Sequence, residues 1–556
     1  MRKALYKRFT VIEKSRLCWN KSLCNTMKAD RRQADESTRL LSEDHKVGIL
    51  GRNSSEDPDH YASANRYNRH APTETAGPIE LLSSGKSSVC TVHHHHVAYA
   101  QRWYILLLFS MLAIWSAAAW NTWGPISDTS KVVFNWSDGD VALLTNWSFI
   151  TMVTSGMFFS WMMDVKGLRL ATLTSALLLF IGTGIRALPV GIDNVIWSMN
   201  IGMIFVGLSN PILLAGPPLL SSVWFPPHQR TTATAIASQC SYLGIGMSYL
   251  VGPQVVHNIY TEHESNISSD YTDDIGSTNE SLPPKLRQTY FSQIMELMYI
   301  ELAICAALLI CVFMSFPAKP PTPPSNTAEI QRKDFKQGAL ILVRKRQFWI
   351  LGFAYGFSMG IYGAWSTMLD PIFEETLGVK QLTTGWIGVT SNIAGTIGGL
   401  LFAGCVDYLG GKMRCLLMFL CGGASLACLW IICLSHRWIT FNIESLYAAC
   451  ILYGFLVNAT VPIFYEMAVE GMYPVAEGIT TMVIVLLNQS SGLVYISIKM
   501  IPGVGSQWMN WVAFASVAVC LPLLFIYKER HNRLDVDLLE EEEEFPITDE
   551  GQDNKA

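Results

Sequence analysis

Long apolar runs alternate with short polar loops through most of the chain. A helix needs roughly 20 mostly apolar residues to cross a membrane. Twelve stretches meet that requirement: 103–122, 141–163, 170–188, 195–222, 231–252, 294–316, 348–370, 382–405, 415–435, 443–464, 475–500 and 508–527. The pattern predicts an all-α membrane protein with twelve transmembrane helices in two six-helix halves.

The polar segments divide the chain into five predicted parts. Residues 102–316 and 348–527 hold six spans each, and the Pro-rich, basic stretch 317–347 reads as a cytosolic linker rather than a helix. Residues 1–101 are polar and Ser-rich, which predicts a disordered cytosolic tail. Residues 528–556 form an acidic tail that we also place in the cytosol.

Composition agrees with a membrane protein, and no motif in the sequence favours an enzyme. Half of the 556 residues are hydrophobic and 15% are charged, against about 25% charged residues in soluble proteins. The sequence has no P-loop, no metal-spaced His/Cys set and no Ser/His/Asp arrangement, so ATP-driven transport is also disfavoured. The tract His93–His96 has no further ligand nearby in the sequence, so we predict no metal site and no cofactor.

Basic residues in the loops predict the orientation in the membrane. The loops after spans two, four, six and eight are rich in Lys and Arg, which places them in the cytosol: Lys166, Arg169, Arg230, Arg332, Lys333, Lys336, Lys412 and Arg414. Both termini are then cytosolic, and the loop 253–293 faces the lumen or exterior. Asn266 and Asn279 in that loop are candidate glycosylation sites, and Asn135 in the first outer loop is a weaker one.

One charged turn occurs twice. The stretch MMDVKGLRLATL at 162–173 has a counterpart in LFAGCVDYLGGKMRCLL, at an offset of 407 − 164 = 243 residues, where Asp164, Gly167 and Arg169 match Asp407, Gly410 and Lys412. Gly permits a tight turn, and a carboxylate at a helix end can hold a basic group or the N-terminus of a neighbouring helix. The usual enrichment of basic residues in cytosolic loops would explain Arg169 and Lys412, but it would not explain why the aspartates and glycines also match. We predict a latch in each half that controls conformational exchange and does not contact solute.

Three further stretches carry a family resemblance: RWYILLLFSMLAIWSAAAWNTWGPI, WFPPHQRTTATAIASQCSYLG and VPIFYEMAVEGMYPVAEGIT. With the repeated turn, they resemble the major facilitator superfamily and, within it, the feline leukemia virus subgroup C receptor-related family over residues 102–527. The long N-terminal tail and the acidic C-terminus depart from that pattern. The resemblance implies a lysosomal, proton-driven secondary transporter that exports a small organic solute such as pyridoxine (vitamin B6). Choline or haem transport remains an alternative, as does a transporter-fold receptor or nutrient sensor.

Aromatic and amide side chains in equivalent spans are candidates for solute binding, because aromatic rings bind flat or cationic ligands. The candidates are Trp123, Tyr242, Tyr362, Trp365, Asn458 and Gln489. An interfacial aromatic belt is the alternative near the outer ends of spans, and we favour it for Trp120. Both interpretations stay open for Trp123 and Trp365, and close helix packing is the alternative for Tyr242.

Carboxylates within apolar spans are costly and usually functional. Glu301, Asp370, Glu466 and Glu470 are therefore candidates for proton coupling. Asp370, beside a proline near the outer end of its span, is our first choice. Glu466 and Glu470 share a helix face, and a gating or flanking role at the cytosolic side is the alternative for them.

The N-terminal tail contains a candidate sorting signal. Glu36, Leu40 and Leu41 in ADESTRLLSED have the spacing of an acidic dileucine signal for endosomes and lysosomes. The expected partners are a small-molecule solute, protons, the lipid bilayer and sorting adaptors, and no nucleic acid.

Overall fold

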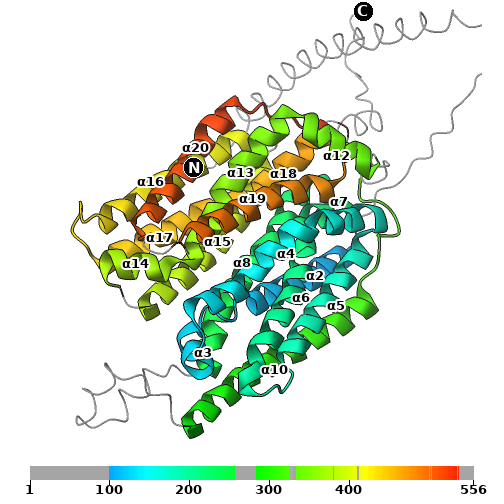
Figure 1. The fold of residues 1–556 in the computed structure, drawn as a ribbon. Coiled ribbons are helices and arrows are strands. Elements are labelled where there is room, and N and C mark those ends of the chain that lie inside the picture. The colour runs from blue at the N-terminus through cyan, green and yellow to red at the C-terminus, as the bar shows by residue number, and fades with distance from the viewer. Residues whose placement is uncertain are drawn as a thin grey trace, which may run out of the picture. The chain divides into compact units, whose positions relative to one another are not determined.

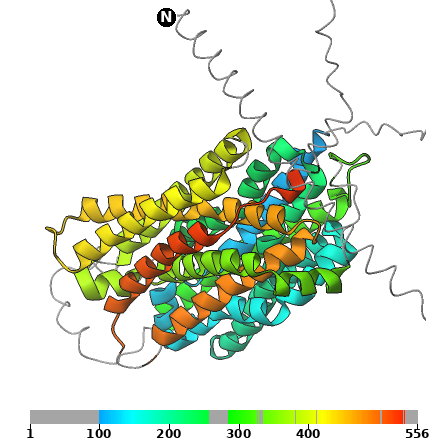
Figure 2. The same cartoon turned by 90° about the horizontal axis from the view of Figure 1, so that it is seen from above.

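A computed structural model describes residues 99–256, 284–325, 327, 334–379, 381–409, 412–499, 501, 504–534 and 536. These residues belong to one compact unit, Val92–Ala556. Within the described residues the regular secondary structure is helical, with no strand. The helices form two bundles that lie side by side (Figure 1, Figure 2).

The first bundle contains six spans, and a π-helical turn follows the second of them. Its helices are α2 (Gln101–Trp120), α3 (Ser127–Phe134), α4 (Asp138–Trp161), the π-helical turn Met162–Lys166, α5 (Leu168–Arg186), α6 (Val195–Ala215), α7 (Pro217–Trp224), α8 (Arg230–Val255) and α10 (Pro284–Ser315). Short 3-10 turns at Ile192–Asn194 and Pro227–Gln229 precede α6 and α8.

The second bundle repeats this arrangement after a short helix, α12. Its helices are α12 (Phe335–Arg344), α13 (Arg346–Thr367), α14 (Leu369–Leu377), α15 (Gln381–Leu409), α16 (Met413–Ser435), α17 (Ile443–Asn458), α18 (Thr460–Met472), α19 (Glu477–Lys499) and α20 (Gln507–Ile526). The two bundles meet along α8 with α15 and along α4 with α19.

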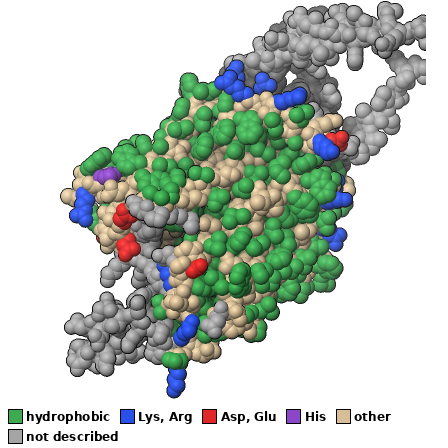
Figure 3. Space-filling model, in the orientation of Figure 1, with side chains coloured by type: hydrophobic (Ala, Val, Ile, Leu, Met, Phe, Trp, Pro, Cys, Tyr) green, Lys and Arg blue, Asp and Glu red, His purple; other side chains and the backbone are tan. Residues whose placement is uncertain are grey.

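The predicted fold class, with two six-helix halves, is confirmed, although the spans are not equally apolar. Among the described residues, ten spans are long and apolar enough to cross a membrane. The other two are α8 and α13, of 26 and 22 residues, which are rich in Gly, Ser, Thr and Tyr. They are more polar because each presents one face to the space between the bundles. Figure 3 shows the lipid-facing flank covered by hydrophobic side chains, with Lys and Arg gathered near its ends.

The fourth and tenth spans are each broken in the middle, which their continuous apolar sequences did not reveal. The breaks separate α6 from α7 and α17 from α18. Proline has no backbone N–H, so Pro218 cannot bond the carbonyl of Leu214, and Pro462 cannot bond the carbonyl of Asn458. Each break therefore leaves at least one main-chain carbonyl available to a partner outside its own helix.

The stretch predicted as a linker is helical in its second part. Helix α12 packs on α13 and α19, with Leu342 buried. Leu340 and Val343 are exposed beside the exposed side chains of Lys336 and Arg344. The expectation that this stretch contains no helix is wrong for Phe335–Arg344, where apolar residues are spaced for one face of a helix.

Close packing of α2 against α8 depends on one glycine. A methyl group at Gly244 would collide with the backbone carbonyl of Ile114 in α2. Two residues further along the same helix, a methyl group at Gly246 would meet no heavy atom within 4 Å. Substituting these two glycines by alanine in separate variants therefore distinguishes a steric clash at Gly244 from the general effect of replacing glycine in a helix.

Gly244→Ala should lower the thermal unfolding temperature of the detergent-solubilised protein, because overpacking costs about 1–3 kcal/mol. The matched control, Gly246→Ala, should unfold at the wild-type temperature or slightly above it, since Ala favours helix over Gly. Equal unfolding temperatures for the two variants would contradict the packing argument.

Candidate functional site

A cavity lies between the two bundles. It encloses about 1220 Å³ of empty space, part of which is open to solvent, and 14 of its 28 lining residues come from each bundle. Within α8 and α13, lining residues begin near the middle and continue toward one end, from Ser238 to Tyr249 and from Tyr355 to Thr367. This end is opposite to the one that carries Asp164 and Asp407. We call the end with these two aspartates the latch end and the other the open end.

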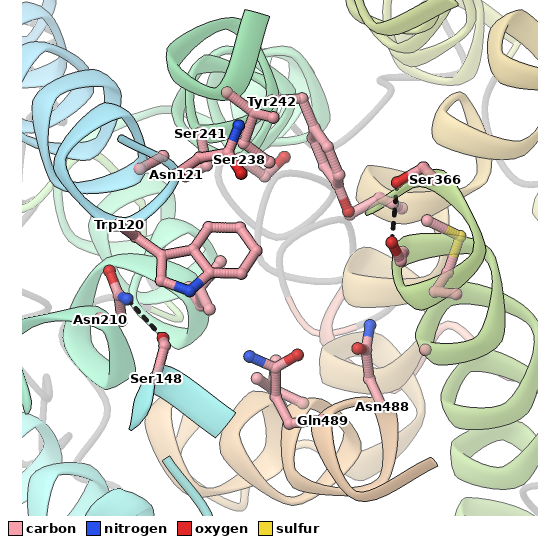
Figure 4. Close-up of a pocket in the computed structure, with 18 of the residues that line it drawn as sticks. Trp120, Asn121, Ser148, Asn210, Ser238, Ser241, Tyr242, Ser366, Asn488 and Gln489 are labelled. Atoms are coloured by element: carbon pink, nitrogen blue, oxygen red, sulfur yellow. Dashed lines mark hydrogen bonds between the residues drawn. The ribbon is translucent and has the colours of Figure 1, made fainter. Parts of the chain in front are cut away.

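The cavity has an aromatic and amide lining without charge. Its lining residues include neither Asp or Glu nor Lys, Arg or His. Figure 4 shows Trp120 of α2 and Tyr242 of α8 on one side, with Asn488 and Gln489 of α19 on the other. The indole N–H of Trp120 donates to the carbonyl of Thr145 at 2.9 Å, which fixes the ring at the cavity wall. Such a surface suits a ligand that is flat, neutral or cationic, and carries hydroxyl or amine groups.

Two of the six predicted solute-binding residues line this cavity, namely Tyr242 and Gln489. Tyr362, Trp365 and Asn458 lie behind its wall in the second bundle. There, the amide of Asn458 donates to the hydroxyl of Tyr362 at 3.1 Å, and the indole of Trp365 donates to Asn510 at 2.8 Å. These side chains brace α13 against α17 and α20 and do not reach the cavity.

The structure places two tryptophans differently from the expectation. Trp120, assigned to an interfacial belt, lines the cavity. Trp123 is fully buried in the first bundle, where its ring packs on Trp136 at 5.3 Å between centroids and on the guanidinium of Arg186 at 5.7 Å. The reason is that α2 ends at Trp120, and the chain then turns away from the cavity before Trp123.

Spacing within helices carried a signal for the residues that were missed. On α8, Ser238, Tyr242, Ile245 and Tyr249 recur every three to four residues and all line the cavity. On α13, Tyr355, Met359 and Gly363 do the same. A polar or aromatic stripe on a membrane helix marks the face that avoids lipid.

The two predicted latch aspartates bond across the bundles. Asp164 of the first bundle accepts the backbone N–H groups of Gly478 and Ile479 at 2.9 and 2.8 Å, at the start of α19. Asp407 of the second bundle accepts those of Thr231 and Thr232 at 3.2 and 2.8 Å, at the start of α8, and the Thr232 hydroxyl at 2.6 Å. Each carboxylate thus meets the positive end of a helix dipole in the opposite bundle.

The remaining parts of the repeated turn are arranged around these carboxylates. Gly167 has a φ of 92°, which side chains rarely adopt, so glycine permits the turn between the π-helical segment and α5. Arg169 and Lys412 are exposed. Gly410 lies outside the described residues.

The carbonyls released by proline are also used across the bundles. The carbonyl of Leu214 accepts the hydroxyl of Tyr465 at 3.1 Å, and Tyr465 in turn accepts the hydroxyl of Tyr355 at 3.0 Å. The carbonyl of Asn458 accepts the side-chain amide of Gln239 at 2.8 Å. Together with the aspartates, these bonds hold the latch end closed below the cavity.

The candidate proton-coupling carboxylates occupy three different places. Glu301 is buried within the first bundle, where it pairs with Arg186 at 3.1 Å. Glu466 and Glu470 are buried on α18 near the latch end, and Glu470 accepts the backbone N–H groups of Arg533 and Leu534 at 3.3 and 3.1 Å. Asp370 belongs to α14, but its side chain lies outside the described part.

Several predicted sites lie outside the described residues: Glu36, Leu40, Leu41, His93–His96, Asn266 and Asn279. Asn135 is described and exposed at the end of α3. No group of three or more potential metal ligands occurs among the described residues.

Comparison with known proteins identifies the family. The sequence pattern of the Major Facilitator Superfamily matches residues 96–496. A solute carrier family 49 member 4 homolog of Xenopus tropicalis is 33% identical over 445 residues, covering 79% of this chain and 94% of the relative. The chain belongs to the major facilitator superfamily and, within it, to solute carrier family 49. It is therefore a secondary transporter, and the resemblance seen in the sequence is confirmed.

Other matches agree with this assignment. The choline/ethanolamine transporter flvcr2a of Danio rerio is 27% identical over 436 residues, covering 76% of this chain and 84% of the relative. The crystal structure of the E. coli fucose:proton symporter FucP superposes with a TM-score of 0.57 at 13% identity, covering 78% of this chain and all of the other. This carrier therefore shares the fold of such proteins.

Asp164→Asn should weaken the closed latch end, because the amide keeps one acceptor, loses the charge and turns an NH₂ group toward a backbone donor. Hydrogen bonds to charged groups contribute about 1.5–3 kcal/mol, which shifts the balance of states roughly ten- to a hundredfold. We expect faster hydrogen exchange in the first turn of α19 and a lower turnover. Asp140→Asn is the control, since Asp140 bonds Ser137 within its own helix start. Equal exchange in both variants would rule out the latch.

Proposed function

We propose that this carrier exports a small organic solute from the lysosome, driven by protons, and that pyridoxine is such a solute. The observation that carries the proposal is the uncharged, aromatic and amide-lined cavity shared equally by the two bundles. Pyridoxine is a flat aromatic ring with hydroxyl groups, which stacks on Trp120 or Tyr242 and bonds to Asn488 or Gln489.

The alternative solutes differ in how well they suit this lining. Choline is a quaternary ammonium ion, which aromatic rings bind through cation–π attraction, and relatives of the chain are choline/ethanolamine transporters. Haem carries two carboxylates, and the cavity lining offers no cationic side chain to receive them. The lining therefore favours pyridoxine or choline over haem.

The orientation proposed for the membrane follows from the basic loops. Lys166, Lys412 and Arg414 lie at the latch end, which we place in the cytosol, with both termini on that side. The open end then faces the acidic lumen, and a solute that enters there leaves with protons moving down their gradient. A buried carboxylate among Glu301, Glu466, Glu470 and Asp370 would carry the proton.

Trp120→Ala should weaken pyridoxine binding roughly ten- to a hundredfold, because base–aromatic stacking contributes about 1–3 kcal/mol. Uptake of labelled pyridoxine into proteoliposomes, with an acidic compartment on the open side, measures this effect and tests the proposed function. Trp197→Ala is the matched control, since Trp197 of α6 is 71% exposed on the outer flank. Labelled choline serves as the competing solute.

A transporter-fold receptor or nutrient sensor would bind solute without moving it. Binding of pyridoxine that depends on Trp120, together with no uptake into proteoliposomes, would favour that alternative. Preferred uptake of choline would replace the proposed solute and leave the transport mechanism intact.

Changing Leu40 and Leu41 to Ala should move the protein from lysosomes to the cell surface, because sorting adaptors would no longer recognise the acidic dileucine signal on a cytosolic tail. Fluorescence microscopy and surface biotinylation measure the redistribution. Changing Leu81 and Leu82 to Ala is the control, since the residue four positions before the first leucine of that pair is Gly77 and not an acidic residue. Unchanged lysosomal staining would remove the role assigned to Glu36, Leu40 and Leu41.

A further inference from the structure

A second, smaller cavity lies inside the first bundle, between α2, α8 and α10. It encloses about 350 Å³ of empty space including open solvent, and its polar lining consists of Thr122, Ser248 and Glu301. Glu301 is 5% exposed, and its partner Arg186 is fully buried. An ionisable pair so deep in a membrane bundle needs a function or a strong structural reason.

The pair is bonded to the last turn of α2 and to the segment that follows it. Arg186 donates to the carbonyl of Ala119 at 3.0 Å while it contacts Glu301 at 3.1 Å. The hydroxyl of Thr122 donates to the other carboxylate oxygen of Glu301 at 2.5 Å. Both charged side chains therefore hold the part of the chain that carries Trp120 and Asn121.

One hydrogen bond joins the wall of the second cavity to the wall of the solute cavity. Asn121 lines the solute cavity and donates to the hydroxyl of Ser248, at 2.9 Å, which lines the second cavity. Asn121 and Thr122 are consecutive, so one residue faces solute while the next is bonded to Glu301. A shift of Thr122 would therefore also move Asn121 in the wall of the solute cavity.

Few other ionisable groups act on Glu301. Among the described residues, Arg186 of α5 and Cys305 of its own helix are the charged or titratable groups that interact with it. The segment after α2 and the helix α8 present the neutral hydroxyls of Thr122 and Ser248. The Glu301 carboxylate therefore supplies the negative charge that faces Arg186, and protonation of this one group removes it.

We propose that Glu301 is the proton-binding site of this carrier and that Arg186 transmits its state to the solute cavity through the end of α2. A proton that enters from the open end neutralises the Glu301 carboxylate, and Arg186 then keeps the carbonyl of Ala119 and the ring of Trp123 as its contacts. The loss of the ion pair releases Arg186 from Glu301 of α10, so that Arg186 and the end of α2 that it holds can shift together and move Trp120 and Asn121. The proton leaves Glu301 when the latch end opens. This inference rests on the proton-driven transport proposed above.

The test uses purified full-length protein in proteoliposomes with labelled pyridoxine and the membrane potential clamped at zero. A carrier that moves one proton with one neutral solute accumulates it about tenfold per unit of pH gradient, because 1.4 kcal/mol corresponds to a tenfold ratio. Glu301→Gln should reduce accumulation to less than twofold and keep the exchange of labelled for unlabelled solute. Glu296→Gln is the matched control, since Glu296 is exposed on the same helix and should behave as wild type.

A second variant distinguishes loss of proton coupling from a folding defect. Glu301→Gln leaves Arg186 buried without its counter-ion, so the double variant Arg186→Gln with Glu301→Gln removes both charges and should be folded and uncoupled. Accumulation near the wild-type value in either variant would overturn the proposal, as would an equal loss in Glu296→Gln.

A measurement without solute separates this inference from the proposed function. Infrared difference spectra taken across a pH titration should show a protonated carboxyl band in the wild type and in Glu296→Gln that is missing in Glu301→Gln. An unchanged band in Glu301→Gln would overturn the proton site, even if the carrier moves pyridoxine. A wild type that moves no pyridoxine but shows the Glu301 band would overturn the proposed solute and support the proton site.

Discussion

Every backbone polar group within a membrane needs a partner inside the protein, because lipid offers none. This carrier uses that requirement at the contact between its bundles. Pro218 and Pro462 each release one carbonyl, at Leu214 and Asn458, and a side chain of the opposite bundle takes it. The unpaired N–H groups at the starts of α8 and α19 are likewise bonded by Asp407 and Asp164. The bundles are thus joined at backbone groups that would lack a hydrogen-bond partner within their own bundle.

Hydrogen bonds between the bundles can be replaced by hydrogen bonds to water at a small cost in free energy, and a transporter that changes between states requires such replaceable contacts. The halves are held by hydrogen bonds and by packing of small residues, and the cavity between them holds no charge that would need a permanent partner. Opening the latch end exposes two helix starts, two carboxylates and two carbonyls to the aqueous side, where water bonds to them instead. The difference between the two states is therefore a small sum of exchanged hydrogen bonds.

The sequence predicted the parts of the fold that depend on local pattern. Twelve apolar runs predicted the spans, and the repeated Asp-x-x-Gly pattern predicted the turn between the second and third span of each half. Gly167 has a φ of 92°, at which a residue with a side chain would be strained. The sequence did not predict which face of a helix lines the cavity, because that face depends on where each helix ends. Trp120 and Trp123 are three residues apart, and only the end of α2 between them decides that one lines the cavity and the other packs on Arg186. The pairing of Glu301 with Arg186, 115 residues apart in the chain, left no local signal at all.

The two bundles differ in their use of charge, although their helices correspond. The first bundle buries an ion pair between α5 and α10, at the side of the open end, whereas the buried Glu466 and Glu470 of the second bundle lie on α18 near the latch end. The two bundles run in the same direction through the membrane, so identical halves would place their buried charges at the same end. Because these charges lie at opposite ends of the cavity, each can respond to the aqueous phase on its own side. The proton-driven transport proposed above needs such a difference between the two ends, which the repeated helices alone do not supply.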